Sequence, residues 1–257
     1  MTSTPHGSST DLAQRLHTNA SVCEVALTRQ LSASLHEIVL RGNAEVLCGV
    51  PGNDVMIRLE DPTGSFVRRR YSVRGVDTER DQFTLWICTI HDGPGSQWVQ
   101  GAAAGDFVDV VGPRGKIPLD PVADWHLFMG DATGFSAFYR MAQSIEAPGR
   151  AIFIVEIDHD DDARTAEFNE GVGITAIFVN RFGRARDDSH GLLSGLGAFA
   201  FPARQGHAYL FGEFSVINVL RTALLDRGLS DEQISRKAYW RMGRRNAENG
   251  EPEKDQS

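Results

Sequence analysis

Lysine is nearly absent from this sequence, which limits how its positive charge can be used. Only Lys116, Lys237 and Lys254 are lysines, so almost every cation is an arginine. Arginine can hold a phosphate or a carboxylate with two parallel hydrogen bonds, whereas lysine acts as a point charge. Arginine-rich composition is therefore compatible with phosphate binding, although GC-rich coding produces the same bias.

Cysteine is also scarce, with only Cys23, Cys48 and Cys88 in 257 residues. Three scattered cysteines are too few for a disulfide framework or an iron–sulfur cluster. Each lies in or beside an apolar run, which predicts buried thiols. The eight histidines lack the paired spacing of metal ligands, so we expect no metal site in the chain.

The sequence lacks a basic cluster and a long apolar run, and both absences exclude classes of function. The net charge is −8 and no basic stretch is long enough for a nucleic-acid-binding face. No apolar stretch reaches membrane-spanning length. The first residues do not have the basic-then-apolar layout of a signal peptide. We therefore expect a cytoplasmic protein that binds neither nucleic acid nor membranes.

The first half of the sequence has the texture of a small antiparallel β-structure. Short apolar or alternating runs recur between turns rich in Gly and Pro, which is typical of a barrel or sandwich. One short helix is expected from Ser96 to about Ala103. The predicted strands are Val22–Thr28, Leu35–Leu40, Asp54–Leu59, Tyr71–Arg74, Phe83–Ile90 and Phe107–Val111.

From about residue 120 onward, apolar strands alternate with helical segments. This alternation predicts a parallel sheet of the nucleotide-binding type. The helical segments are Thr133–Ile145 and Ser215–Asp226. The predicted strands are His126–Met129, Ala151–Ile157, Thr175–Asn180 and Ala208–Phe211.

These patterns predict a protein of two domains, an N-terminal antiparallel β-barrel and a C-terminal α/β domain. Residues 1–20 are expected to be a disordered arm and residues 246–257 a disordered tail, because both are polar. Residues 21–120 are expected to form the antiparallel β-barrel. Residues 121–245 are expected to form the α/β domain with its parallel sheet.

The first chemical motif is formed by Arg69, Tyr71 and Ser72. On a strand, Arg69 and Tyr71 project from the same face because side chains alternate. The guanidinium can then hold a phosphate, the tyrosine ring can pack on a flavin, and the serine can reach a polar edge of that ring. A surface strand with solvated arginines would show the same pattern.

The second motif runs from His91 to Trp98. Gly93 and Gly95 allow the backbone to approach a ligand closely. Ser96 is expected to cap a helix whose N-terminus could bind a pyrophosphate. A plain loop–helix junction is the alternative, but the segment follows the arginine–tyrosine strand in the order that a bound dinucleotide flavin requires.

Six motifs in the same order make the sequence resemble the siderophore-interacting ferric reductases, a family of flavoproteins. The resemblance runs from about Val22 to Arg244. Its motifs here are Arg69/Tyr71/Ser72, Gly93-Pro94-Gly95-Ser96 with Trp98, Gly112-Pro113-Arg114-Gly115, Asp124-Trp125 with Gly130-Asp131-Ala132-Thr133, Gly212-Glu213, and Tyr239-Trp240-Arg241.

The resemblance implies FAD in the barrel and NAD(P)H as reductant for iron(III) in a small-molecule chelate. It implies three groups of residues, in addition to the flavin as the reactive centre. These residues would bind the flavin, contact the nicotinamide or bind the substrate, and the last group is basic so that it would attract an anionic chelate. The implied flavin-binding residues are Arg69, Tyr71, Ser72, Thr89, His91, Gly93, Pro94, Gly95, Ser96 and Trp240; those on the nicotinamide side are Asp131, Thr133 and Glu213; those for substrate are Arg58, Arg114 and Arg241.

The sequence departs from the family pattern in three places. The loop after Gly130 has lost a Glu and a Pro and contains Phe135 and Phe138. Phe214 follows Gly212-Glu213 where small residues are usual. A histidine of the family pattern is replaced near Thr89. Bulky rings there would narrow or occupy the approach of the nicotinamide to the flavin. Ordinary drift within the family, which would leave that approach intact, is the favoured interpretation.

Three functions are compatible with these motifs. The leading one is a flavin-dependent oxidoreductase that reduces a ferric chelate. The alternative is a repurposed flavin scaffold that catalyses a redox-neutral cyclisation or rearrangement in natural-product biosynthesis. The third is a binding module without turnover. Arg181, Arg184 and Arg186 are candidates for a 2′-phosphate, but the sequence decides neither NADH against NADPH nor the oligomeric state.

Overall fold

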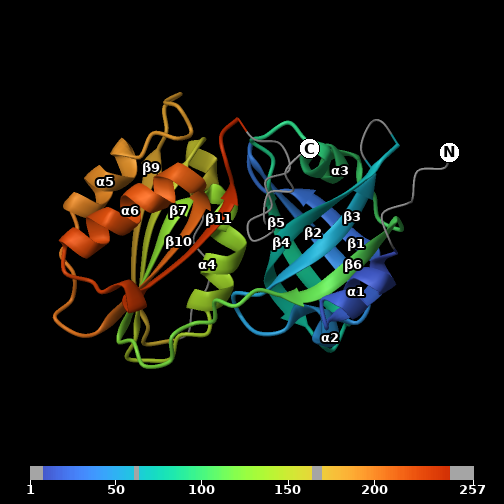
Figure 1. Ribbon diagram of the computed structural model, residues 1–257, viewed down its shortest axis with the longest axis horizontal. Coiled ribbons are helices and arrows are strands. Elements are labelled where there is room, and N and C mark those ends of the chain that lie inside the picture. Colours follow the sequence, from blue (N-terminus) through green and yellow to red (C-terminus); the bar gives the residue numbers. More distant parts are fainter. Residues whose placement is uncertain (1–7, 61–63, 164–169, 244–257) are drawn as a thin grey trace, which may run out of the picture. The chain divides into compact units, whose positions relative to one another are not determined.

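The computed structural model describes residues 8–60, 64–163 and 170–243, which form two compact units (Figure 1). One unit contains the described residues up to Leu119 together with Phe135–Ser144. The other contains Asp120–Gly134, Ile145–Ala163 and the described residues that follow. The expected division of the chain at residue 120 therefore meets an exception, because Phe135–Ser144 groups with the first unit.

The first unit is a closed antiparallel barrel with strand order β1-β2-β5-β4-β3-β6. This confirms the predicted barrel. Alternate residues face an apolar interior, as Val55, Ile57 and Leu59 do on β3. The strands are β1 (Asn19–Gln30), β2 (Leu35–Arg41), β3 (Asp54–Glu60), β4 (Phe66–Asp77), β5 (Gln82–Cys88) and β6 (Phe107–Arg114).

A helix occupies part of the segment that the sequence suggests to be a disordered arm. Helix α1 spans Ser9–Arg15 and begins with a capping box, in which Ser8 and Asp11 satisfy each other's backbone N–H groups. Ala13 packs against Met56 and Val111 on the outer surface of the barrel wall. Capping and this apolar contact stabilise the helix where composition alone favours disorder.

Three further helices belong to the barrel unit. Helix α2 spans Ala44–Cys48, and α3 spans Pro94–Gly101. Helix α4, Phe135–Ala142, lies against β4 and β5. Ser136 fixes it there, since its Oγ accepts a hydrogen bond from Trp86 N at 2.9 Å and donates one to Trp86 O at 3.0 Å.

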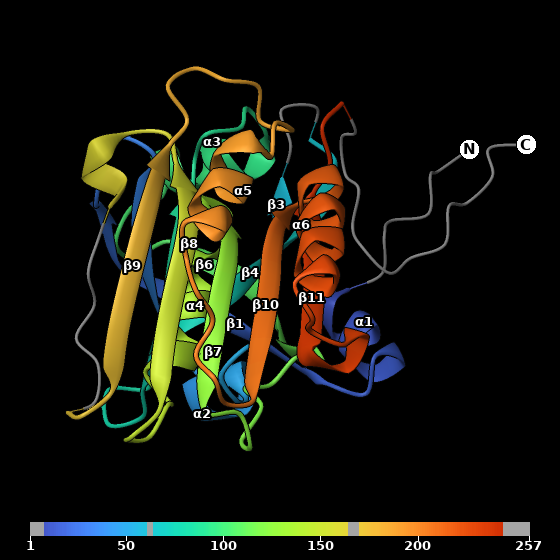
Figure 2. The same cartoon turned by 90° about the vertical axis from the view of Figure 1, so that its left-hand side faces the viewer.

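The second unit is built on a parallel five-stranded sheet with order β11-β10-β7-β8-β9, which confirms the predicted α/β class. Figure 2 shows α5 (His190–Gly197) and α6 (Phe214–Asp226) over one face of this sheet. Short 3-10 helices span Ala132–Gly134, Asp160–Asp162 and Asp231–Gln233. The strands are β7 (Trp125–Asp131), β8 (Arg150–Ile157), β9 (Gly173–Asn180), β10 (Gly206–Glu213) and β11 (Ile234–Trp240).

The strand order creates a switch point between β7 and β10. The chain proceeds from β7 to β8 and β9 on one side, and then crosses to β10 and β11 on the other. In open α/β sheets, ligands bind outside the carboxyl ends of the strands at such a point. In the described part of the chain, no helix has the length and apolar character needed to cross a membrane.

Candidate functional site

Arg69 and Tyr71 lie on the same face of β4, as the sequence predicts. Tyr71 pairs with Val55 and Arg69 with Ile57 across the β3–β4 ladder. Tyr71 packs against the apolar interior cluster that contains Val55 and Ile57. Cross-strand partners project from the same face of a sheet, so both motif side chains face away from the outer surface that α1 covers.

Helix α3 places Gly95 and Trp98 beside Tyr71. Side-chain atoms of Arg69 and Tyr71 are the nearest neighbours of a Cβ built at Gly95. The rings of Tyr71 and Trp98 are 6.0 Å apart between centroids and tilted by 34°. The structure thus gathers the arginine–tyrosine motif and the glycine-rich motif around one point.

Ser96 does not cap helix α3, contrary to the sequence prediction. The N-cap is Gly93, Pro94 is the first helical residue, and the Ser96 hydroxyl donates a hydrogen bond to the carbonyl of His91. No side chain among the described residues caps this N-terminus. Proline is favoured at the first helical position because its missing N–H is not needed there, which explains the earlier start.

The N-terminus of α3 and the Tyr71 hydroxyl fit a phosphate-bearing flavin. The hydroxyl oxygen is buried and finds no hydrogen-bond partner among the described residues. Burial raises the pKa of Tyr71 well above its ordinary value, so the hydroxyl keeps its proton and remains a donor. A Cβ at Gly93 would meet nothing within 4 Å, which leaves open space beside the uncapped N–H groups.

Ser72 and Thr89 use their hydroxyls within the protein. Ser72 is buried on the opposite face of β4 from Tyr71 and bonds Asp54 Oδ1 at 3.2 Å, while Arg70 pairs with Asp54 Oδ2 at 2.6 Å. Thr89 follows β5 and donates to the carbonyl of Ser34 at 3.2 Å. The Ser72 hydroxyl is thus engaged on the other face of β4 from Tyr71 and the Thr89 hydroxyl is engaged by Ser34, and their contact with the flavin stays a prediction.

In the second unit, Asp131 ties three strand ends together at the carboxyl edge of the sheet. Its carboxylate accepts hydrogen bonds from Thr133 N at 2.9 Å, Glu213 N at 3.0 Å and Trp240 Nε1 at 3.0 Å, and also from the Thr133 hydroxyl. The close approach of the strands requires Gly130, where a Cβ would overlap the carbonyl oxygen of Phe211. Four predicted residues therefore meet at the switch point.

Glu213 caps helix α6 at the same edge. Its carboxylate accepts hydrogen bonds from the backbone N–H groups of Ser215, Val216 and Met242. Burial favours a higher pKa, but these hydrogen bonds outweigh it and hold the pKa of Glu213 below its ordinary value. Glu213 is thus an ionised structural cap at the edge where the sequence predicts nicotinamide contacts.

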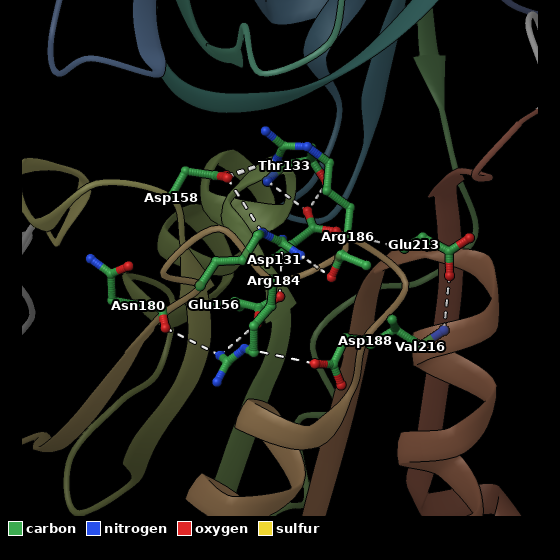
Figure 3. A network of polar contacts seen from close by, with 12 residues as sticks. Asp131, Thr133, Glu156, Asp158, Asn180, Arg184, Arg186, Asp188, Glu213 and Val216 are labelled. Atoms are coloured by element: carbon green, nitrogen blue, oxygen red, sulfur yellow. Dashed lines mark hydrogen bonds and ion pairs between the residues drawn. The ribbon is translucent and has the colours of Figure 1, made fainter.

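Arg181, Arg184 and Arg186 form an ion-pair network at the ends of β8 and β9 (Figure 3). Glu156 pairs with Arg181 Nη2 at 2.9 Å and with Arg184 Nη2 at 3.3 Å. Asp158 pairs with Arg181 Nε at 3.3 Å and with Arg186 Nη1 at 2.9 Å. The sequence suggests these three arginines as ligands of a 2′-phosphate, but each is already paired with a carboxylate.

Sequence reasoning missed the partners in this network. Glu156 is 2% exposed, and burial raises its pKa even though Arg181 and Arg184 oppose that effect. A glutamate near the end of an otherwise apolar strand was the available signal, since a buried carboxylate requires a charged partner. Asp158 and Asp162, in the acidic run that follows β8, are likewise not exposed.

The three substrate candidates occupy different environments. Arg58 pairs with Asp109 at 3.4 Å and lies over the Phe66 ring at 3.5 Å, on the face of β3 opposite to Ile57. It therefore does not share a face with Arg69 and Tyr71. Arg114 is half-buried at the end of β6. Arg241, in the second unit, is exposed and lies over the Phe214 ring at 4.8 Å.

The bulky rings that distinguish this sequence are mostly internal. Phe135 is 1% exposed and Phe138 is fully buried. Phe135 stacks on Tyr139 with 5.4 Å between ring centroids. Only Phe214 keeps an exposed ring, at 37%. Phe135 and Phe138 are therefore packing residues of the protein interior.

Within the described ranges, no three His, Cys, Asp or Glu side chains gather as a metal site requires. Cys23 and Cys48 are buried, and burial raises the pKa of each thiol to about 12. Both thiols therefore stay protonated and unreactive at neutral pH.

Comparisons with known proteins find related sequences and solved structures of the same fold. An uncharacterized protein of Mycobacterium tuberculosis is 28% identical over 190 residues, which are 68% of this chain and 65% of that protein. The chain thus spans less than two thirds of that relative. The electron transfer subunit of dihydroorotate dehydrogenase B (NAD(+)) from Bacillus cereus is 28% identical over 137 residues, 52% of each chain. A siderophore utilization protein from T. fusca superposes with a TM-score of 0.79 at 24% identity, covering 90% of this chain and 95% of that one.

Two family models match the chain and together cover more than half of it. The siderophore-interacting FAD-binding domain matches residues 60–117, and the siderophore-interacting protein model matches residues 123–243. The first match contains Arg69, Tyr71 and the start of α3, so the flavin of this barrel is FAD. The chain belongs to the siderophore-interacting protein family.

Proposed function

We propose that the protein is a FAD-dependent oxidoreductase that uses NAD(P)H to reduce iron(III) in a siderophore-type chelate. The observation that carries this proposal is the buried, unpartnered Tyr71 hydroxyl beside Gly95 and Arg69 in the family's FAD-binding domain. A parallel sheet with a switch point in the same chain supports nucleotide binding.

Bound FAD supplies the chemistry, which is acceptance of a hydride and release of electrons one at a time to a ferric centre. The protein then has to hold, orient and tune the cofactor. Arg69 would hold a phosphate with two charge-assisted hydrogen bonds. The N–H groups that begin α3 would hold the pyrophosphate. The Tyr71 hydroxyl, which keeps its proton, would donate to a polar edge of the flavin.

An anionic chelate needs local positive charge on a protein whose net charge is −8. Arg241 suits this role best among the three candidates, because it is exposed and contacts an aromatic ring. Arg114 is a second candidate. Arg58 suits it least, since Asp109 balances its charge on the opposite face of the sheet from Tyr71.

The burial of Phe135 and Phe138 favours the reductase over a redox-neutral enzyme. Those rings were the main reason to suspect that hydride supply had been lost. With both rings internal, the departures that remain on the nicotinamide side are the exposed Phe214 and the Glu and Pro missing from the loop after Gly130. The redox-neutral cyclisation is therefore the second candidate, and these loop departures are what support it.

The test is an absorption spectrum of the purified protein, followed by anaerobic titration with NADH and with NADPH. We expect a flavin spectrum that bleaches with at least one nucleotide and recovers when a ferric chelate is added without oxygen. Release of iron(II) is followed with a ferrous-specific chromophore. A flavin that neither nucleotide reduces, or reduced flavin that no ferric chelate reoxidises, would contradict the proposal.

A further inference from the structure

Three arginines and three carboxylates interlock at the carboxyl ends of β8 and β9, and this arrangement bears on nucleotide choice. Arg181 and Arg184 share Glu156, and Arg181 and Arg186 share Asp158. Arg184 also approaches Asp188 at 3.8 Å and donates to the carbonyl of Asn180 at 3.1 Å. In Figure 3, dashed lines join Arg184 to Glu156 and Asp188, and Arg186 to Asp158.

Burial fixes this network in place. The side chain of Arg181 is 3% exposed and that of Glu156 is 2% exposed. Asp158 is 11% exposed and receives two arginines. Each of these carboxylates is shared by two arginines, so withdrawing one guanidinium would remove half of the compensation of a mostly buried charge, which is unfavourable. The arginines are therefore not available to an incoming anion at little cost.

In doubly wound folds, the position of this network is the one that contacts the adenosine ribose of a bound dinucleotide. Strand β8 lies next to β7 on one side of the switch point and is the second strand of the nucleotide-binding half. In doubly wound folds, an acidic residue at the end of that strand accepts the ribose 2′-hydroxyl of NADH, whereas an available arginine accommodates the 2′-phosphate of NADPH. Glu156 and Asp158 are the acidic residues here.

The charge balance of this edge opposes a further anion. Glu156, Asp158 and Asp188 balance the three arginines. Asp131 and Glu213 add carboxylates at the ends of the neighbouring strands β7 and β10. A phosphate group brings roughly two more negative charges at neutral pH, whereas a hydroxyl brings none and can donate to a carboxylate oxygen.

We infer that the nucleotide site of this protein is specific for NADH, because Glu156 and Asp158 hold the arginines that the 2′-phosphate of NADPH would need. The inference rests on the proposed use of a nicotinamide nucleotide and narrows it to one of the two. It assigns Asp158, the more accessible of the two acids, as the residue that determines specificity.

Binding measurements test this without turnover. The FAD-loaded protein is titrated calorimetrically with NAD⁺ and, separately, with NADP⁺. We expect NAD⁺ to bind more tightly by at least about ten-fold, as expected when like charges are brought together. Equal affinities, or tighter NADP⁺ binding, would overturn the inference and leave the proposed reductase standing. Binding of neither nucleotide would overturn both.

Two carboxylate variants with the same change in charge then locate the cause. Asp158→Asn releases Arg186 and should raise NADP⁺ affinity several-fold relative to NAD⁺. Asp160→Asn is the matched control in the same acidic run, because Asp160 accepts from Asn180 Nδ2 rather than from an arginine. An equal gain in NADP⁺ affinity in both variants would show a general charge effect and refute the assignment of Asp158.

Arg186→Gln keeps the inference testable if Asp158→Asn does not fold. Arg186 is 27% exposed and pairs with one carboxylate, Asp158, whereas Arg181 and Arg184 each pair with two, so it is the easiest of the three to replace. Because Asp158 already engages it, its loss should change NADP⁺ affinity by no more than about two-fold. A loss of about ten-fold, typical of a direct phosphate contact, would mean that Arg186 serves the 2′-phosphate and would overturn the inference.

Discussion

Gly95 lies against the hydroxyl of Tyr71, and a Cβ atom at residue 95 would overlap the hydroxyl oxygen. The same atom would lie 3.9 Å from Arg69 Cγ. The backbone of Gly95 is that of an ordinary helical residue, so glycine is needed here for space and not for its conformation. The glycine-rich motif and the arginine–tyrosine motif are thus parts of one site.

Gly95→Ala should weaken FAD binding without unfolding the barrel. The added methyl group must displace the Tyr71 ring, and such overpacking costs about 1–3 kcal/mol, which is about five-fold or more in the dissociation constant. Flavin content after dialysis and fluorescence titration of the apoprotein measure this. Gly101→Ala is the matched control in α3, because a Cβ there meets nothing within 4 Å. Equal FAD affinity in both variants would contradict the steric role of Gly95.

Arg69→Ala should remove most of the flavin from the purified protein. Loss of a charge-assisted contact to phosphate weakens binding by about ten- to hundred-fold. Arg68→Ala is the control. Arg68 is the neighbour of Arg69 on β4, but it lies opposite Arg58 in the β3–β4 ladder and its side chain projects from the other face. The ratio of flavin to protein absorbance distinguishes them. Full retention of FAD by Arg69→Ala would refute the placement of the phosphate contact.

The sequence was sufficient where one local rule decides the structure. Alternation along a strand was enough to place Arg69 and Tyr71 on one face. The recurrence of short strands followed by alternating strands and helices was enough to predict both folds. The capping box of Ser8 and Asp11 was also readable, and attention to it would have predicted α1 within the polar arm.

The sequence was insufficient where the answer depends on which strands become neighbours. Arg58 was grouped with the substrate residues, but its pairing with Asp109 and its face of the barrel follow only from the β3–β6 and β3–β4 ladders. The partners of Arg181 come from β8, the strand beside β9. Strand order and register select these ion pairs, and neither is encoded in a single segment.

Arg181→Met should destabilise the second unit by about 3 kcal/mol, since it removes one of the two guanidinium groups that compensate the buried carboxylate of Glu156 and leaves only Arg184. Urea unfolding followed by circular dichroism measures the free energy of unfolding. Arg80→Met is the control, because Arg80 forms a surface ion pair with Asp77 in which Arg80 is 75% and Asp77 is 37% exposed. It should leave the free energy of unfolding unchanged within error. Similar losses for both variants would mean that burial does not set the strength of the Arg181 network.

His126→Gln should remove part of the acid sensitivity of the second unit. Burial lowers the pKa of His126 from 6.5 to about 4, so the folded protein binds this proton less readily than the unfolded chain. The stabilising contribution of the neutral ring is therefore complete above about pH 6.5 and is lost as the pH falls toward 4. The loss amounts to about 3 kcal/mol for this one group. Urea unfolding at neutral pH and near pH 4 should show a smaller decrease for the variant than for the natural protein. An identical decrease in the two proteins would mean that groups other than the buried ring of His126 cause the loss of stability at low pH.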